Sequence, residues 1–175
     1  QTSADQLKKP GLVSSLTHNI DLGTLEKKDA IADAVAVYLS SHDEILKGVN
    51  LSDFKIDYVH HLDTNLYFKG MTYIGYKQIV RQDVPIEGTR LHIAVKHLID
   101  GTRKRYVIMY IRGDFLPNSA QYLPAKPNVG NEVIQEKARE LLGDFAQGKN
   151  IDHQEQVLKY FPEQGTWQLA NIVHF

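Results

Sequence analysis

The chain has 175 residues, no cysteine and a formal net charge of −1, with 42% hydrophobic and 23% charged side chains. This balance is typical of a globular protein that buries one or two cores. It favours neither a nucleic-acid partner nor a membrane partner, because there is no excess of basic residues and no apolar run of about 18 residues. The absence of cysteine excludes disulfide bonds and thiolate chemistry.

Residues 1–23 are polar with scattered leucine and valine. We expect them to be a lead-in segment, extended or poorly ordered. The chain begins with Gln1, and we expect a secreted or periplasmic protein from which a signal peptide has been removed.

The next elements predict a helix and a sheet. Thr24 can cap a helix, because apolar residues recur at intervals of three and four as far as Leu39. Strand-like runs then follow at Phe54–Leu62, Leu66–Val80, Thr89–Leu98 and Arg105–Arg112. In the third run Leu91, Ile93 and Val95 share one face, which we expect to lie in the core. A helix followed by an antiparallel meander predicts an α+β fold.

A second module is predicted after a linker at residues 117–130, which are rich in proline, asparagine and serine. Asn131 can cap another helix, closed by Gly148. The runs Gln156–Phe161 and Thr166–Phe175 flank a turn and predict a hairpin. The order helix-then-strands therefore recurs in 131–175, but it stops after two strands. We expect this module to be incomplete at its C-terminal end and marginally stable.

The most informative segment joins two strands through a polar turn. Tyr76 and Gln78 end the first strand, Asp83 lies in the turn, and a V-P-I-x-G motif (Val84–Gly88) leads into the second. This order resembles the propeptides of thermolysin-type secreted zinc metallopeptidases, in which Y-x-Q runs through a short turn into V-P-V-x-G. Asp83 stands where that family usually has glycine. The similarity extends, more loosely, from Leu25 to Phe175.

The resemblance implies two cystatin-like modules, each a helix packed on an antiparallel sheet: an FTP-like module at 24–116 and a PepSY-like module at 131–175. It implies that the chain is no enzyme but the non-catalytic part of a metalloprotease precursor. As a propeptide it would be the intramolecular chaperone and inhibitor of its own metallopeptidase, which keeps the zymogen inactive. The partner would be the cognate mature metallopeptidase domain, which would supply the catalytic zinc. This chain would carry no catalytic residue, cofactor or metal ligand. The residues expected to contact the partner are Tyr76, Gln78, Val84, Pro85, Ile86, Gly88, His174 and Phe175.

Eight histidines raise the alternative of a metal site. His60 and His61 are adjacent on a predicted strand and would point to opposite faces. His92 and His97 also differ in strand parity, and the chain contains no H-E-x-x-H motif. We therefore expect solvent-facing strand histidines rather than metal ligands.

Aromatic side chains crowd the first predicted sheet. They are Tyr58, Tyr67, Phe68, Tyr73, Tyr76, Tyr106 and Tyr110. They can serve as core and cross-strand pairs, or some can form an exposed face that docks a partner. A second function also stays open at this point: a stand-alone cystatin-like binding module of the cell envelope or extracellular space, unconnected to a protease.

Overall fold

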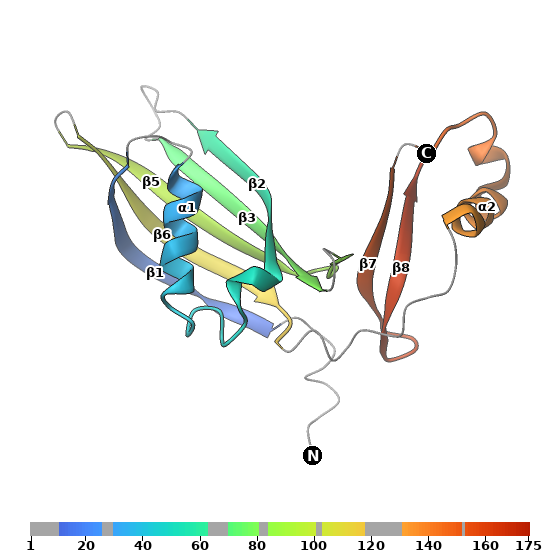
Figure 1. The fold of residues 1–175 in the computed structure, drawn as a ribbon, viewed down its shortest axis with the longest axis horizontal. Coiled ribbons are helices and arrows are strands. Elements are labelled where there is room, and N and C mark those ends of the chain that lie inside the picture. Colours follow the sequence, from blue (N-terminus) through green and yellow to red (C-terminus); the bar gives the residue numbers. More distant parts are fainter. Residues whose placement is uncertain are drawn as a thin grey trace, which may run out of the picture. The chain divides into compact units, whose positions relative to one another are not determined.

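The computed structural model describes residues 11–25, 30–62, 70–80, 84–100, 103–117, 131–151 and 153–175. It divides into two compact units (Figure 1). The first comprises Gln1–Ile79 and Gly88–Asn118, and the second comprises Val80–Glu87 and Ser119–Phe175. The predicted division into 24–116 and 131–175 did not foresee that the short segment Val80–Glu87 belongs to the second unit. Asp83 and nearly all of the predicted linker lie outside the described residues.

The first unit packs one helix on an antiparallel sheet. Its elements are β1 (Gly11–Thr24), α1 (Ala30–Ser40), the short 3-10 turn η2 (Leu51–Asp53), β2 (Phe54–Leu62), β3 (Met71–Val80), β5 (Arg90–Asp100) and β6 (Arg103–Phe115). The strand order is β1-β6-β5-β3-β2, and the neighbouring strands are antiparallel. Helix α1 lies across one face of this sheet (Figure 1). The α+β arrangement predicted from the sequence is confirmed.

The predicted lead-in segment at residues 1–23 needs a correction. Residues Gly11–Thr24 form strand β1, which pairs with β6. Ile20 and Leu22 pack against the core of this unit. Thr24 ends the strand instead of capping a helix, and α1 begins at Ala30. Three register shifts interrupt the pairing of β1 with β6. Such shifts break the strict alternation by which a strand is recognised in a sequence.

The core of the first unit lies between α1 and the sheet. The helix buries Ile31, Val35 and Leu39, which recur every fourth residue and therefore share one helix face. The sheet side of this core consists of buried apolar and aromatic side chains: Phe54, Ile74, Tyr76, Leu91, Ile93, Val95, Tyr106, Ile108, Ile111 and Phe115. The prediction that alternate residues of β5 face the core is confirmed.

Strand β6 departs from strict alternation. Ala94 pairs with Tyr110 and Val95 pairs with Ile108, so Met109 is the extra residue of a bulge. As a result Ile108 and Ile111 both lie in the core, although a regular strand would place them on opposite faces. The bulge also places Tyr110 on the face of the sheet opposite to Tyr106 and Ile108.

The second unit consists of a helix, a hairpin and a short extended segment. Its elements are β4 (Val84–Pro85), α2 (Asn131–Leu142), the 3-10 turn η4 (Gly143–Ala146), β7 (His153–Phe161) and β8 (Thr166–His174). Strands β7 and β8 pair in the predicted hairpin. Ile86 forms a parallel bridge with Leu158, and the Glu87 amide donates a hydrogen bond to the Leu158 carbonyl at 2.8 Å. Ile86 and Glu87 thereby lie along one edge of the hairpin.

The second unit buries little apolar surface. Val80, Ile86 and Leu158 form its hydrophobic cluster, with Val84, Trp167 and Leu169 packed partly against it. Four large apolar side chains of α2 and η4 are exposed: Val133 (49%), Leu141 (86%), Leu142 (42%) and Phe145 (79%). The Arg139 guanidinium lies 5.5 Å from the ring centre of Phe175.

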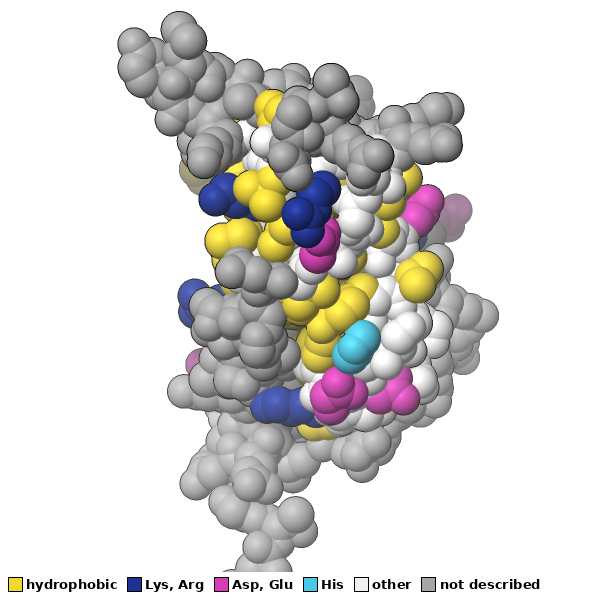
Figure 2. Space-filling view, turned by 90° about the vertical axis from the view of Figure 1, so that its left-hand side faces the viewer, with side chains coloured by type: hydrophobic (Ala, Val, Ile, Leu, Met, Phe, Trp, Pro, Cys, Tyr) yellow, Lys and Arg dark blue, Asp and Glu magenta, His cyan; other side chains and the backbone are white. Residues whose placement is uncertain are grey.

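The described surface is mixed in character. In the face shown by Figure 2, charged side chains of both signs lie among apolar ones. This agrees with the nearly neutral total charge. None of the helices in the described ranges is long and apolar enough to cross a lipid bilayer.

Candidate functional site

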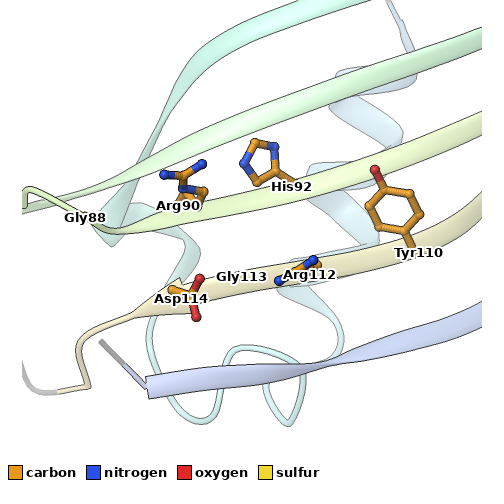
Figure 3. A pocket seen from close by; sticks show the side chains of 7 residues that line it. All are labelled: Gly88, Arg90, His92, Tyr110, Arg112, Gly113 and Asp114. Carbon is orange, nitrogen blue, oxygen red and sulfur yellow. The ribbon is translucent and has the colours of Figure 1, made fainter. Parts of the chain in front are cut away.

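The candidate site lies on the face of the first sheet that points away from α1. A pocket of about 520 Å³ opens there along β5 and β6 (Figure 3). It is lined by Gly88, Arg90, His92, Tyr110, Arg112, Gly113 and Asp114. The sequence places Arg90 and His92 there because they alternate with the core residues of β5.

Strand register sets the layout of the pocket. Arg90 is opposite Asp114, and His92 is opposite Arg112. Side chains that face each other across antiparallel strands have Cβ atoms about 4.5–5.5 Å apart, so these four side chains form a compact grid. Gly113 brings the strands close: a Cβ built there would lie 2.8 Å from the Arg90 carbonyl oxygen. Only glycine fits at that position without displacing β5.

The pocket is electrically positive near His92. Within the described residues, neither Arg90 nor Arg112 makes an ion pair. Burial and the charges of these two arginines lower the pKa of His92, against the smaller opposing effect of Asp57 and Asp114. His92 is therefore neutral at pH 7.

Tyr58 holds the His92 ring. Its hydroxyl lies 2.6 Å from the Nδ1 atom of His92. The Tyr58 ring crosses above Gly75, where an added Cβ would come within 2.2 Å of a ring carbon. Burial raises the pKa of Tyr58, so its hydroxyl keeps its proton at neutral pH. We assign the hydroxyl as the donor to Nδ1, which places the imidazole proton on Nε2.

Two tyrosines border a buried alanine on the same face. Tyr73 is opposite Ala94, and Ala94 is opposite Tyr110. Ala94 is fully buried, whereas both tyrosines are partly exposed. This face therefore offers aromatic surface next to the charged pocket, a combination that favours binding of another protein. The core interpretation of the aromatic residues is confirmed for Tyr76 and Tyr106, and the docking interpretation stays a prediction. Tyr67 and Phe68 lie outside the described residues.

The structure places two of the expected partner-binding residues in the interior of the first unit. Tyr76 is 4% exposed, and among the described residues its hydroxyl has no hydrogen-bond partner. Gln78 is fully buried: its Nε2 donates to the Leu116 carbonyl and its Oε1 accepts from the Leu116 amide, both at 2.7 Å. Gln78 therefore has a structural task, which its place in the motif did not reveal.

The remaining six expected residues are divided between the two units. In the second unit Ile86 is buried, Val84 and Pro85 are half-buried, His174 is exposed, and Phe175 is half-buried. In the first unit Gly88 has a left-handed backbone (φ 79°) and lines the pocket. Of the eight expected residues, Gly88 is thus the one that reaches the pocket of Figure 3. The partner-binding role of the eight stays a prediction.

The histidine prediction requires a correction at His97, which is 9% exposed. Its Nε2 lies 2.8 Å from the hydroxyl of the buried Thr72, and His61 Nδ1 lies 2.9 Å from the same oxygen. His97 is buried because it shares the core side of β5 with Tyr106 on β6. In the part of the chain that the structure describes, no three histidine, aspartate or glutamate side chains gather as a metal site would require.

Sequence reasoning named Tyr110 among the aromatic residues, but it did not single out Arg90, Arg112 or Asp114. The alternation that identified the core face of β5 also assigns Arg90 to the opposite face. The register and the bulge that bring β6 residues beside it come from pairing between strands and leave no local signal. Comparisons with protein-family models, curated proteins and solved structures found no match for this chain.

Proposed function

We propose that this chain is a non-catalytic binding module, the prodomain of a thermolysin-type secreted metallopeptidase, which assists the folding of that enzyme and then inhibits it. In this proposal its two units are cystatin-like propeptide modules. The support from the sequence is the order of motifs from Tyr76 to Gly88. The partner domain would provide the zinc and the catalytic groups.

The observation that carries the proposal is the helix-free face of the first sheet. Strand β3 presents Tyr73 there, and β6 presents Tyr110 and Arg112. Tyrosine and arginine are among the side chains that most often dominate the binding energy of interfaces. The opposite face of the same strands packs against α1 in the core of the first unit, which fixes their backbone. Such a preformed surface loses little conformational entropy when a partner docks.

A rigid docking face accounts for both activities. A surface that binds the native peptidase but not its unfolded chain stabilises the native state by mass action. The same affinity keeps the prodomain attached after folding, where it blocks access to the active site. No catalytic group on this chain is needed for either effect.

The test is inhibition in trans. The purified chain is added to a panel of mature thermolysin-type peptidases, and hydrolysis of a fluorogenic peptide is followed. We expect saturable inhibition of at least one enzyme, weakened by about tenfold or more in the double variant Tyr73→Ser/Tyr110→Ser. The control is Val37→Ser on the exposed side of α1, which is 68% exposed and should inhibit like the parent chain. Lack of inhibition across the panel would contradict the prodomain proposal and favour a stand-alone binding module.

A further inference from the structure

Arg90 and Arg112 occupy diagonal positions on neighbouring strands, one on each side of the pocket (Figure 3). Diagonal side chains of an antiparallel pair are separated by about 7–8 Å at the backbone, within reach of two long side chains that converge on one group. Both are exposed at their ends and have no ion-pair partner in the described ranges. Two such guanidinium groups beside a neutral histidine are suited to bind an anion.

We propose that this pocket binds a carboxylate, presented by a glutamate or aspartate side chain of a peptide segment. Arginine forks match the two oxygens of a carboxylate, and each arginine can donate two parallel hydrogen bonds. The inference does not depend on a metallopeptidase being the partner, because it rests on the chemistry of the pocket alone.

The negative charge of Asp114 makes the pocket better suited to a carboxylate than to a phosphate. Asp114 lines the pocket together with the two arginines, while His92 is neutral at pH 7. The formal charge of the pocket is therefore +1, from two arginines and one aspartate. A singly charged carboxylate is matched by this charge. A phosphate group, with a charge of about −1.5 to −2 at pH 7, would exceed it and would be repelled by Asp114.

His92 supplies a third donor. With Nδ1 accepting from Tyr58, the ring carries its proton on Nε2, and the ring itself lines the pocket. The hydrogen bond to Tyr58 restricts rotation of the ring, so little freedom is lost when an anion binds. A bound carboxylate would offset the charges of Arg90 and Arg112, and the pKa of His92 would then rise.

Tyr110 makes the site suited to a side chain rather than a free small anion. Its partly exposed ring lines the pocket beyond Arg112. The ring can cover the methylene groups that connect a glutamate carboxylate to its backbone. The volume of about 520 Å³ accommodates such a side chain with part of its backbone.

The experiment uses the full chain labelled with ¹⁵N and follows the His92 ring and the backbone amides of β5 and β6 by NMR. The probes are a blocked tripeptide with a central glutamate, the same tripeptide with glutamine, and inorganic phosphate. We expect saturable shifts and an increased pKa of His92 with the glutamate peptide. We expect about tenfold weaker binding for the glutamine peptide and for phosphate.

Variants assign the effect to the pocket. Arg90→Gln and Arg112→Gln should each weaken glutamate-peptide binding by about tenfold. The matched control is Lys96→Gln, which removes one positive charge from β5 outside this pocket. It should leave binding within about twofold of the parent, the small change expected for a screened charge. Amide spectra of all three variants verify that the fold is retained.

Several outcomes would overturn the inference. Equal or tighter binding of phosphate would show an anion site that does not select carboxylates. Equal weakening by Lys96→Gln would show a diffuse charge effect in place of a pocket. Absence of saturable shifts with the glutamate peptide would remove the site altogether. Each of these results can occur whether or not the chain inhibits a peptidase, so the failure of this inference is separable from failure of the proposed function.

Discussion

The two units are built from similar elements but differ in how much they bury. In the first, α1 places three fully buried side chains against five paired strands. In the second, the hydrophobic cluster has three buried residues: Leu158 of the hairpin, and Val80 and Ile86 from the distant segment Val80–Glu87. Leu141 of α2 and Phe145 of η4 are more than three-quarters exposed. A helix and strands in the right order are therefore not sufficient for a core.

The difference has a thermodynamic meaning. Stability comes mainly from buried apolar area, so the first unit carries most of the free energy of unfolding. A two-stranded sheet with few buried contacts is marginal in water. We expect the second unit to open at lower denaturant concentration than the first.

The largest expected effect is on the first unit. Ile93 is 1% exposed in the centre of its core, and Ile93→Ala should lower the free energy of unfolding by about 2–5 kcal/mol. Leu141→Ala, at a side chain that is 86% exposed, should change it by no more than about 0.5 kcal/mol. Urea titration followed by circular dichroism measures both. Similar losses would mean that α2 is packed and that the contrast between the units is false.

Ile86→Ala tests the second core. The side chain is 1% exposed and contacts Leu158, so its truncation should cost about 2–3 kcal/mol, toward the lower end for a thin layer that can relax. Trp167 is the single tryptophan and packs against this cluster. Its fluorescence therefore reports on the second unit.

We expect the fluorescence midpoint of Ile86→Ala to shift to lower urea, while the unfolding of the first unit, followed by the backbone amides of β5, keeps its midpoint. A common shift of both signals would show that the chain unfolds as a single cooperative unit.

Gly75→Ala should destabilise the outer face of the first sheet by about 1–3 kcal/mol, the usual cost of overpacking. The new methyl group would occupy the space of the Tyr58 ring, so the hydrogen bond to His92 should be lost. In a Tyr58→Ala background the same substitution should cost much less. Thermal unfolding of the four proteins of this cycle gives the coupling, and additive losses would contradict the contact.

The smallest expected effect is a pH dependence from His92. Its folded pKa lies below the value of about 6.5 for an unfolded chain. Its contribution is therefore fully present above about pH 6.5. As the pH falls below this, the unfolded chain takes up the proton first and stability decreases until the folded pKa is reached.

His92→Gln should remove this part of the pH dependence and cost well under about 1 kcal/mol at pH 7.5. Urea titrations of the parent and the variant at several pH values between about 5 and 7.5 measure the difference. Parallel pH profiles would show that the fold does not lower the pKa of His92.

The sequence was informative where structure follows from local pattern. Alternation was enough to place Ile93 in the core and Arg90 on the other face, and the turn before Thr166 was enough to locate the hairpin. The sequence was uninformative where pairing between distant segments determines the register of a strand or the burial of a side chain. The bulge at Met109 and the shifts in β1 depend on register, and the burial of Ile86 depends on a partner more than 70 positions away, Leu158.

The buried amide of Gln78 has a consequence for how the first unit ends. By donating to and accepting from Leu116, it gives that residue the two hydrogen bonds that a neighbouring strand would give. The next residue is Pro117, whose nitrogen has no hydrogen to donate. The amide hydrogen of Leu116 should therefore exchange with deuterated solvent as slowly as those of β6. In Gln78→Leu it should exchange quickly, and the end of β6 should become open to protease cleavage.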